Sequence, residues 1–367
     1  MRRIAQLIAL AALAVAVIAG TGCERTVTVQ ETVTEPANCF DCHSDQSTFL
    51  VAAEKQWSNS WHASGRTLHE KVRDCKDCHT SEGFVARAAG SPLPSSVTIE
   101  NPTVIHCFTC HAPHTNGDLR LRWTAPYTLE DGTSYNIGAS NLCASCHHSR
   151  ADVASRTAPT YGLYDRWGPH HGPQSDLLMG TNGYEYASYT YDDLTFHRNT
   201  PLDDGSNDGC LKCHFKTELN AVVGGHSFNM EYDLFGEEVF NFGGCDNGAC
   251  HDGAIEDLDD GFNYQTVQDS VETMLVTLRG LLVAGGLLTD STGLPVGTSS
   301  NRFYTSADSA GAVWNFLIVE EDRSHGVHNS KYIIGLLDSA IKFMQGTLSS
   351  PAPVATRRGD DVPGASH

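Results

Sequence analysis

Two cysteines and a histidine recur along the chain in one fixed order, C-x-x-C-H. Two thiols one helical turn apart can form thioethers with the two vinyl groups of a porphyrin, and the next residue then supplies an imidazole to the iron. The order and spacing are those of a c-type haem attachment motif. The five copies are Cys39, Cys42 and His43; Cys75, Cys78 and His79; Cys107, Cys110 and His111; Cys143, Cys146 and His147; and Cys210, Cys213 and His214.

Other uses of paired cysteines explain this spacing less well. A single C-x-x-C-H can be a redox dithiol or half of a zinc site. A disulfide framework, which export favours, gives no reason for a histidine after every second cysteine. Zinc requires four ligands for each ion, and the repeated motif supplies three. Covalent haem is therefore the reading that accounts for all five copies.

A longer variant of the motif, C-D-N-G-A-C-H, contains Cys245, Cys250 and His251. The interval from His214 to His251 is close to the intervals between most of the earlier motif histidines. Asn247 and Gly248 tolerate unusual backbone angles, which lets the longer insert bulge while both thiols reach one porphyrin. We expect a sixth haem here, and a disulfide between the two cysteines is the alternative.

Each iron needs a second axial ligand, and histidine is the most abundant candidate. The chain has 18 histidines and 5 methionines, so ligation by two histidines is favoured over histidine with methionine. The W-G-P-H-H-G-P segment offers His170 and His171, of which we prefer His171, and His197 precedes the fifth motif in a polar loop. His69, His106 and His325 are kept as reserves, and His148 and His367 are read as bystanders.

Together these motifs resemble multihaem c-type cytochromes of the nitrite-reductase and hydroxylamine-oxidoreductase lineage, over residues 38 to about 345. Some such cytochromes also use C-x-x-x-x-C-H. The C-x-x-C-K motif of the catalytic haem in pentahaem nitrite reductase is absent from this sequence. Segments similar to ligand segments of these families imply four further distal ligands, which are His62 in S-N-S-W-H-A, His114 in C-H-A-P-H, His226 in G-G-H-S-F-N-M and His328 in D-R-S-H-G-V-H-N.

The N-terminus is typical of an exported lipoprotein. Arg2 and Arg3 precede an apolar run, Ile4–Ala19, that is shorter than the roughly 20 residues of a bilayer span. Cys23 follows small residues and resembles the acylated cysteine of a lipobox, with an ordinary signal cleavage as the alternative. The net charge of −20 disfavours nucleic acid and suits basic redox proteins or metal and mineral acceptors. We expect a periplasmic, outer-membrane or cell-surface protein.

The elements that must position these groups are short helices joined by long loops. We expect a mainly α fold with extensive loops, in which covalent haems form much of the core, because the loop-rich segment has little apolar periodicity. A tyrosine-rich segment between the fourth and fifth motifs is expected to pack in the core, the alternative being a haem wall or a partner surface. The predicted parts are a signal peptide (1–22), a lipid-anchored tether (23–37), a hexahaem-binding domain (38–254), a C-terminal helical region (255–349) and a disordered tail (350–367).

The C-terminal region has apolar residues at helical spacing and predicts a helical hairpin that packs on the haem domain. Its apolar stripe, or haem stacking, could instead join two copies of the chain. The sequence as a whole predicts an electron carrier that exchanges single electrons with other cytochromes or quinol-linked donors. The alternative is a reductase of nitrite, hydroxylamine or a sulfur oxyanion at one five-coordinate haem.

Overall fold

The computed structural model describes residues 48–65, 73–116, 118–157, 161–192, 197, 209–216, 222–245, 251 and 262–348. All of them belong to one compact unit, His43–His367. Cys23, the first motif (Cys39, Cys42 and His43), Cys250, the predicted signal peptide and tether, and the predicted tail lie outside the described residues. None of the helices within the described ranges has both the length and the apolar character that crossing a membrane requires.

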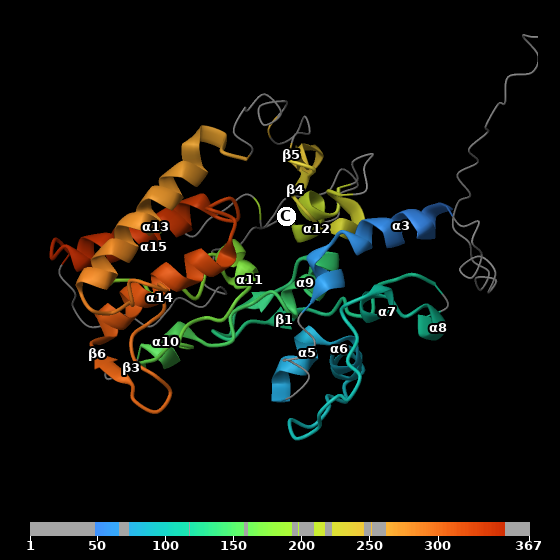
Figure 1. Cartoon of the computed structure of the whole chain (residues 1–367), viewed down its shortest axis with the longest axis horizontal. Coiled ribbons are helices and arrows are strands. Elements are labelled where there is room, and N and C mark those ends of the chain that lie inside the picture. The colour runs from blue at the N-terminus through green and yellow to red at the C-terminus, as the bar shows by residue number, and fades with distance from the viewer. Residues whose placement is uncertain are drawn as a thin grey trace, which may run out of the picture. The chain divides into compact units, whose positions relative to one another are not determined.

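Helices dominate the described part of the chain, as expected, and most of them are short (Figure 1). Long loops and 3-10 turns connect them, because glycine, proline, asparagine and aspartate interrupt the sequence repeatedly. The α-helices are α3 (Thr48–Ser58), α5 (Lys76–His79), α6 (Ser81–Ala88), α7 (Cys107–Cys110), α8 (Pro113–Asn116), α9 (Asn141–Ala144), α10 (Val153–Arg156), α11 (Gln174–Met179), α12 (Gly209–His214), α13 (Val267–Ala284), α14 (Ala307–Asp322) and α15 (Ser330–Met344). The 3-10 turns are η1 (Trp61–Ser64), η2 (Arg73–Cys75), η3 (Gly138–Ser140), η5 (Gly225–Ser227), η6 (Phe242–Gly244) and η7 (Tyr264–Thr266).

Each of the four described C-x-x-C-H motifs lies on or directly beside a short helix. These helices are α5, α7, α9 and α12, in chain order. In the third motif the backbone N–H of His111 donates to the carbonyl of Cys107 (2.9 Å), and in the fourth that of His147 donates to Cys143 (2.8 Å). One helical turn therefore holds both thiols and the histidine of a motif in fixed relative positions, as haem attachment requires.

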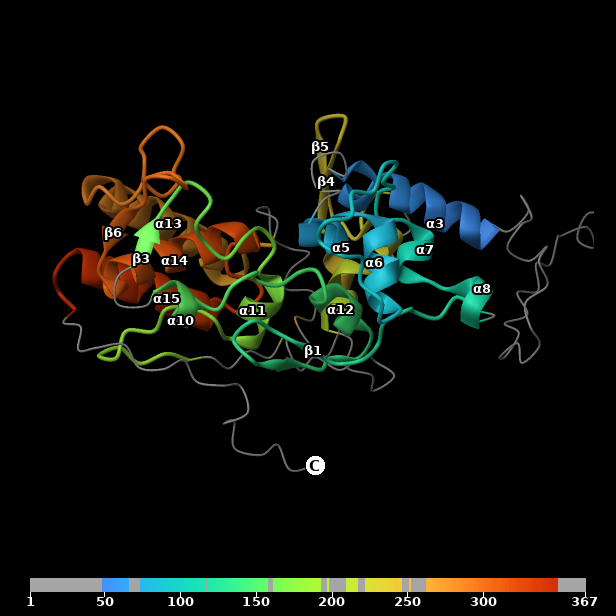
Figure 2. The same ribbon diagram turned by 90° about the horizontal axis from the view of Figure 1, so that it is seen from below.

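The C-terminal region contains three helices that pack on one another, where the sequence predicted a hairpin. Figures 1 and 2 show α13, α14 and α15 side by side. The apolar stripe of α13 that includes Val271, Leu275 and Leu278 is buried within the chain, which supports intramolecular packing over a dimer face. On α14 the residues from Ala310 to Val319 are all buried, so this helix lies at the centre and adds the third member.

The tyrosine-rich segment packs in this C-terminal core, as expected. The backbone N–H of Tyr184 donates to Oδ1 of Asn315 (2.7 Å), and Nδ2 of Asn315 donates back to the carbonyl of Tyr184 (2.9 Å). The indole N–H of Trp314 donates to the carbonyl of Asn182 (2.7 Å). The larger core is therefore shared between the C-terminal helices and the chain between the fourth and fifth motifs, and it is built from ordinary side chains.

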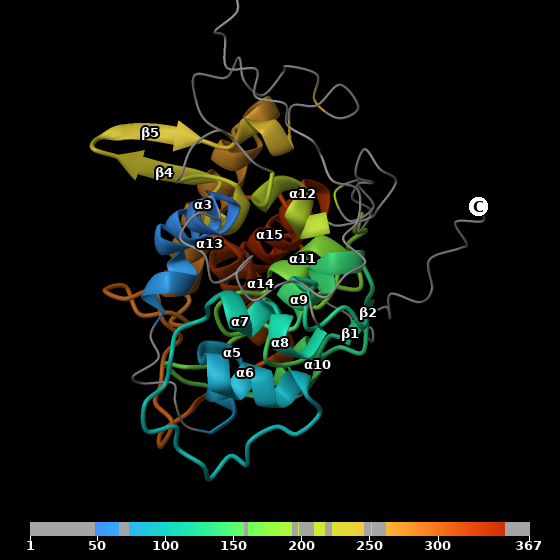
Figure 3. The same ribbon diagram turned by 90° about the vertical axis from the view of Figure 1, so that its right-hand side faces the viewer.

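Three two-stranded antiparallel sheets, which the sequence analysis did not predict, complete the described structure. They are β1 (Tyr127–Thr128) with β2 (Ser134–Tyr135), β3 (Tyr161–Leu163) with β6 (Phe303–Thr305), and β4 (Glu231–Leu234) with β5 (Glu237–Phe240). Figure 3 shows the hairpin of β4 and β5. Its two-residue turn has positive φ at Phe235 (60°) and Gly236 (89°), the geometry that a tight hairpin requires.

Two glycines provide a matched test of the packing around α14. A methyl group on Gly311 of α14 would lie 2.2 Å from a ring carbon of Tyr184, whereas one on the exposed Gly280 of α13 would meet nothing within 4 Å. We expect Gly311→Ala to destabilise the protein by about 1–3 kcal/mol through overpacking. We expect Gly280→Ala to stabilise it by about 0.5–1 kcal/mol through helix propensity. Thermal unfolding of the haem-loaded protein measures both, and equal shifts in one direction would contradict this packing.

Candidate haem centres

Four of the motif histidines face a second histidine from a distant part of the chain. The separations between the two ring centres fall in a narrow range, 6.1 to 6.4 Å. In every pair one ring follows a C-x-x-C and the other lies outside any motif. The pairs are His147 with His62 (6.1 Å), His79 with His170 (6.2 Å), His111 with His226 (6.3 Å) and His214 with His328 (6.4 Å).

This separation fits one metal atom between the two rings. A metal–imidazole bond is about 2 Å long, and each ring centre lies about 1 Å behind its nitrogen, so two opposed ligands have ring centres about 6 Å apart. Two stacked or hydrogen-bonded imidazoles have no reason to keep this spacing four times. The donor set, two thiols and two imidazoles at each centre, is that of a covalently attached haem with two axial histidines. The residues therefore fit haem c.

Hydrogen bonds at Nδ1 orient several of these rings. Nδ1 of His147 donates to Oε1 of Gln174 (3.2 Å), that of His214 to the carbonyl of Phe228 (2.9 Å), and that of His170 to the carbonyl of His171 (3.0 Å). His111 makes the same kind of bond to the carbonyl of Leu119. Because Nδ1 carries the proton in this arrangement, Nε2 is left with a lone pair for a metal.

The charge state of His62 also suits a ligand. Burial first, and the neighbouring His147 second, lower the pKa of His62 to about 4. Burial likewise lowers the pKa of His79, His214 and His226. Neutral imidazole is the form that binds a metal, so these side chains need not lose a proton near pH 7 to do so. His328 differs. Burial lowers the pKa of His328, but the neighbouring Asp322 carboxylate raises it by more, so the pKa of His328 is raised.

Separate elements deliver the distal histidines to the motifs. His62 lies on η1 directly after α3, and Ser60 caps that turn by accepting from the N–H of Ala63 (3.3 Å). His226 lies on η5, which packs on α3, and its backbone N–H donates to Oε1 of Gln56 on α3 (3.1 Å). One helix thus holds the ligands of two different centres.

The C-terminal core delivers the other two distal histidines. His170 follows Trp167, whose ring lies 5.8 Å from that of Trp314 on α14 in an edge-on arrangement. His328 lies in the loop between α14 and α15. The segments that carry these two candidate ligands therefore both adjoin the same buried helix.

At the second motif the geometry favours a histidine other than the one preferred from the sequence, and we propose His170 as the ligand there. The ring opposite His79 is that of His170, and not that of the preferred His171. His170 has a φ of 78°, a left-handed backbone angle that sets the directions of the two adjacent side chains apart. Nδ1 of His171 is bonded instead to a carboxylate oxygen of Glu321 at the end of α14.

Other predicted ligands stay predictions. His114 lies exposed on α8, with its ring 6.0 Å from that of Phe108. Nδ1 of His197 donates to the carbonyl of Val327 (2.7 Å). Burial lowers the pKa of His197, and the nearby His328 and His251 lower it further, so His197 lies near the sixth motif. Within that motif, the ring of His251 lies 4.8 Å from that of Tyr264.

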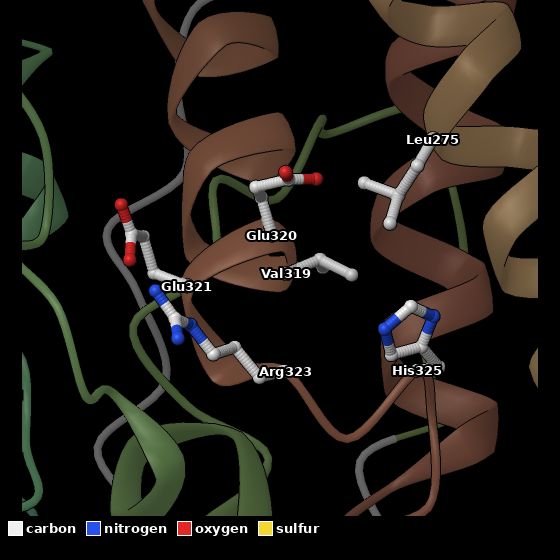
Figure 4. A pocket seen from close by; sticks show the side chains of 6 residues that line it. All are labelled: Leu275, Val319, Glu320, Glu321, Arg323 and His325. Carbon is white, nitrogen blue, oxygen red and sulfur yellow. The ribbon is translucent and has the colours of Figure 1, made fainter. Parts of the chain in front are cut away.

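Three of the remaining histidines have other structural roles. His106 caps α7, where its Nδ1 accepts from the N–H of Phe108 (3.2 Å). His148 is buried, and both of its nitrogens are used, one by the carbonyl of Ser149 (2.6 Å) and one by the hydroxyl of Tyr127 (2.9 Å), as expected for a bystander. His325 lines a cavity of roughly 250 Å³ at the end of α14, together with acidic side chains and Arg323 (Figure 4).

Thiols of different motifs contact one another. Cys78 of the second motif contacts Cys146 of the fourth, Cys143 of the fourth contacts Cys210 of the fifth, and Cys213 of the fifth contacts Cys245 of the sixth. None of the described cysteines forms a disulfide, so these contacts are not disulfides. Cys110 of the third motif also lies close enough to Cys143 to affect it electrostatically.

Several residues that support this arrangement were not identified from the sequence. Arg87 donates to the sulfurs of Cys78 and Cys146 (both 3.6 Å) and to the carbonyl of Ser145 (2.8 Å), so one guanidinium joins two motifs. Nothing in the local sequence distinguishes this arginine. Gln174 and Asp322 were also missed, although both lie in the segments that contain the paired histidines, and a search there for side chains that accept from Nδ1 would have found them.

Comparison with known proteins finds similar cytochromes. No family model matches the chain. Over 362 residues it is 24% identical to the C-type polyheme cytochrome OmcB of Geobacter sulfurreducens, with 82% of this chain and 47% of that protein covered. To OmcC of the same organism it is 23% identical over 345 residues, which covers 77% and 44%. The relatives are multihaem c-type cytochromes. The chain spans about half the length of these relatives.

Two solved structures have a partial likeness to this fold. The outer cell wall cytochrome OcwA is 18% identical, with a TM-score of 0.47, over 79% of this chain and 49% of that one. The undecaheme cytochrome from the S-layer of Carboxydothermus ferrireducens is 16% identical, with a TM-score of 0.43, over 82% and 40%.

The adjacent histidines of the W-G-P-H-H-G-P segment give a sharp test of the pairing. His170→Ala removes the ring that faces His79, so we expect one iron to become high-spin and to bind carbon monoxide when reduced. His171→Ala leaves that ring in place, so we expect every low-spin signal to be kept. Electron paramagnetic resonance of the oxidised variants reads the spin states. The reverse result would indicate His171 as the ligand. No change in either variant would show that neither histidine binds the iron opposite His79.

Proposed function

We propose that this chain is an exported multihaem c-type cytochrome that relays single electrons between redox partners. Haem c held by these residues carries one electron at each iron. The observation that carries the proposal is the set of four facing histidine pairs, each beside a C-x-x-C motif and each with ring centres 6.1 to 6.4 Å apart. Six attachment motifs, five of them C-x-x-C-H and one C-x-x-x-x-C-H, support a complement of six haems.

The contacts between thiols support an order for the relay. A cysteine of an attachment motif bonds to the edge of its porphyrin, so contact between two such sulfurs brings two porphyrin edges together. Cys146, Cys143 and Cys213 each contact a cysteine of another motif. We propose the order second, fourth, fifth and sixth motif, with the third motif beside the fourth through Cys110. Electrons would then enter and leave at the ends of this order, which are the second or third motif on one side and the sixth motif on the other.

Relay is favoured over the alternative of a reductase. A reductase of nitrite, hydroxylamine or a sulfur oxyanion needs one iron with an open position for its substrate. At each of the four described centres a second imidazole lies at the distance at which it would fill that position. The side chains at these centres therefore serve to ligate, orient and bury, which are the functions of an electron carrier.

The location and the partners of the protein follow from the same features. The N-terminal segment with Cys23 supports export and a lipid anchor, and the acidic composition supports basic redox proteins or metal and mineral acceptors. The names of the similar proteins include a cell-wall and an S-layer cytochrome, which fits a role at the cell surface. The closer relation to the nitrite-reductase and hydroxylamine-oxidoreductase lineage, and assembly of copies through the C-terminal helices or stacked haems, stay predictions.

Ligand binding and turnover of the purified haem-loaded protein test the function. We expect the dithionite-reduced protein to show no spectral change with carbon monoxide, to be reoxidised by a small redox protein or a ferric chelate, and to show no turnover of nitrite or hydroxylamine. Carbon monoxide binding together with turnover would establish the reductase instead. Failure of every electron acceptor to reoxidise the protein would contradict a relay.

A further inference from the structure

Asp322, the last residue of α14, holds the axial histidine of one centre. Its side chain is fully buried, and its Oδ1 accepts from Nδ1 of His328 at 2.7 Å. Its other oxygen accepts from the hydroxyl and from the backbone N–H of Ser324, the latter at 3.4 Å. The carboxylate is therefore fixed against the ring that faces His214, and it is shielded from water.

This centre differs from the others in the charge of the group at Nδ1. The rings of His170 and His214 donate to backbone carbonyls, and that of His147 donates to a side-chain amide. His111 also donates to a carbonyl. Among the paired histidines for which the structure gives an Nδ1 bond, His328 is the one that donates to a carboxylate.

A carboxylate at Nδ1 changes the reduction potential of the iron that the ring would bind. It draws the ring proton towards itself and makes Nε2 a stronger electron donor, which stabilises the oxidised, more positive iron over the reduced iron. Its own negative charge acts in the same direction, and burial keeps water from screening it. Hydrogen bonding and charge near the axial ligand are among the groups by which a protein sets haem potentials.

We propose that Asp322 gives the haem of the fifth motif the lowest reduction potential of the four described centres. The inference rests on the proposed function, because it requires His214 and His328 to ligate one iron. In the order proposed above this centre lies between the fourth and sixth motifs. Asp322 would thus act as a positioning residue. It would make electron transfer onto the fifth-motif haem unfavourable, so that electrons stay on the haems on either side of it.

The variant Asp322→Asn tests the charge alone, because asparagine keeps an oxygen that can accept from His328. We expect the lowest step of a spectroelectrochemical titration to rise, and the ratio of oxidised to reduced iron at that step to fall about tenfold at fixed potential, which corresponds to about 59 mV. The low-spin signals should all be kept. An unchanged lowest step with the protein intact would overturn the proposal.

The neighbouring carboxylate supplies a matched control. Glu321 lies at the same end of α14 and lines the cavity in Figure 4, but it is bonded to His171, which faces no motif histidine in the pairs above. Glu321→Gln removes an equal charge one residue away, so we expect the lowest step to move much less than in Asp322→Asn. Equal shifts of the lowest step in the two variants would mean that any nearby negative charge has the same effect, and would overturn the specific role of Asp322.

Two further variants protect the test. Ser324→Ala removes a hydrogen-bond donor to the Asp322 carboxylate, so the carboxylate accepts more strongly from His328. We therefore expect the potential of the lowest step to fall, opposite to Asp322→Asn. A rise in that potential would contradict the proposal. His328→Ala distinguishes the two levels of the account. If it creates one high-spin iron while Asp322→Asn leaves the potentials unchanged, the inference fails and the proposed ligation stands. If it creates none, the ligation itself fails.

Discussion

The arrangement of the described loops depends on one constraint, which is that imidazoles from distant parts of the chain lie in pairs at the spacing that a single metal atom would require. A C-x-x-C-H motif supplies only one side of each centre, and the other side comes from a segment with no motif of its own. The segments that carry the second histidine are loop-rich and have little apolar periodicity, so side-chain packing alone cannot hold them in place. Four rings held at one common spacing from their partners therefore define where the surrounding loops can run.

The apolar core and the metal centres depend on each other through α14. This helix is buried along most of its length, and its contacts extend both to the loop that carries His170 and to the loop that carries His328. Asp322 ends the helix and bonds His328, while the carbonyl of the same residue accepts from Nε2 of Gln174 (3.1 Å), whose oxygen accepts from His147. A short chain of hydrogen bonds thus joins His147 of the fourth motif to His328, the histidine that faces the fifth.

The sequence predicted the local parts of the site and, through resembling segments, three of the distant histidines, but it missed the tertiary contacts that support them. The C-x-x-C-H spacing is fixed by the chemistry of attachment, so the motifs and their short helices could be predicted directly. His62, His226 and His328 were identified from resembling segments, and the structure places each opposite a motif histidine. The choice between His170 and His171 depends on a positive φ at His170; the glycines and prolines around the two histidines indicate a turn but do not indicate which histidine faces His79. Arg87 joins two motifs through the tertiary fold alone, so nothing in its local sequence could reveal it. The central position of α14 also depends on the extended tyrosine-rich segment, which carries no helical periodicity to indicate its partner.

The position of iron in crystals of the haem-loaded protein tests the central claim most directly. Anomalous scattering measured at the iron absorption edge locates each iron without any assumption about the protein model. We predict one iron between the rings of each of the four histidine pairs, with further irons at His43 and His251. Irons bound on one side only at these pairs, or an absence of iron between the facing rings, would contradict this prediction.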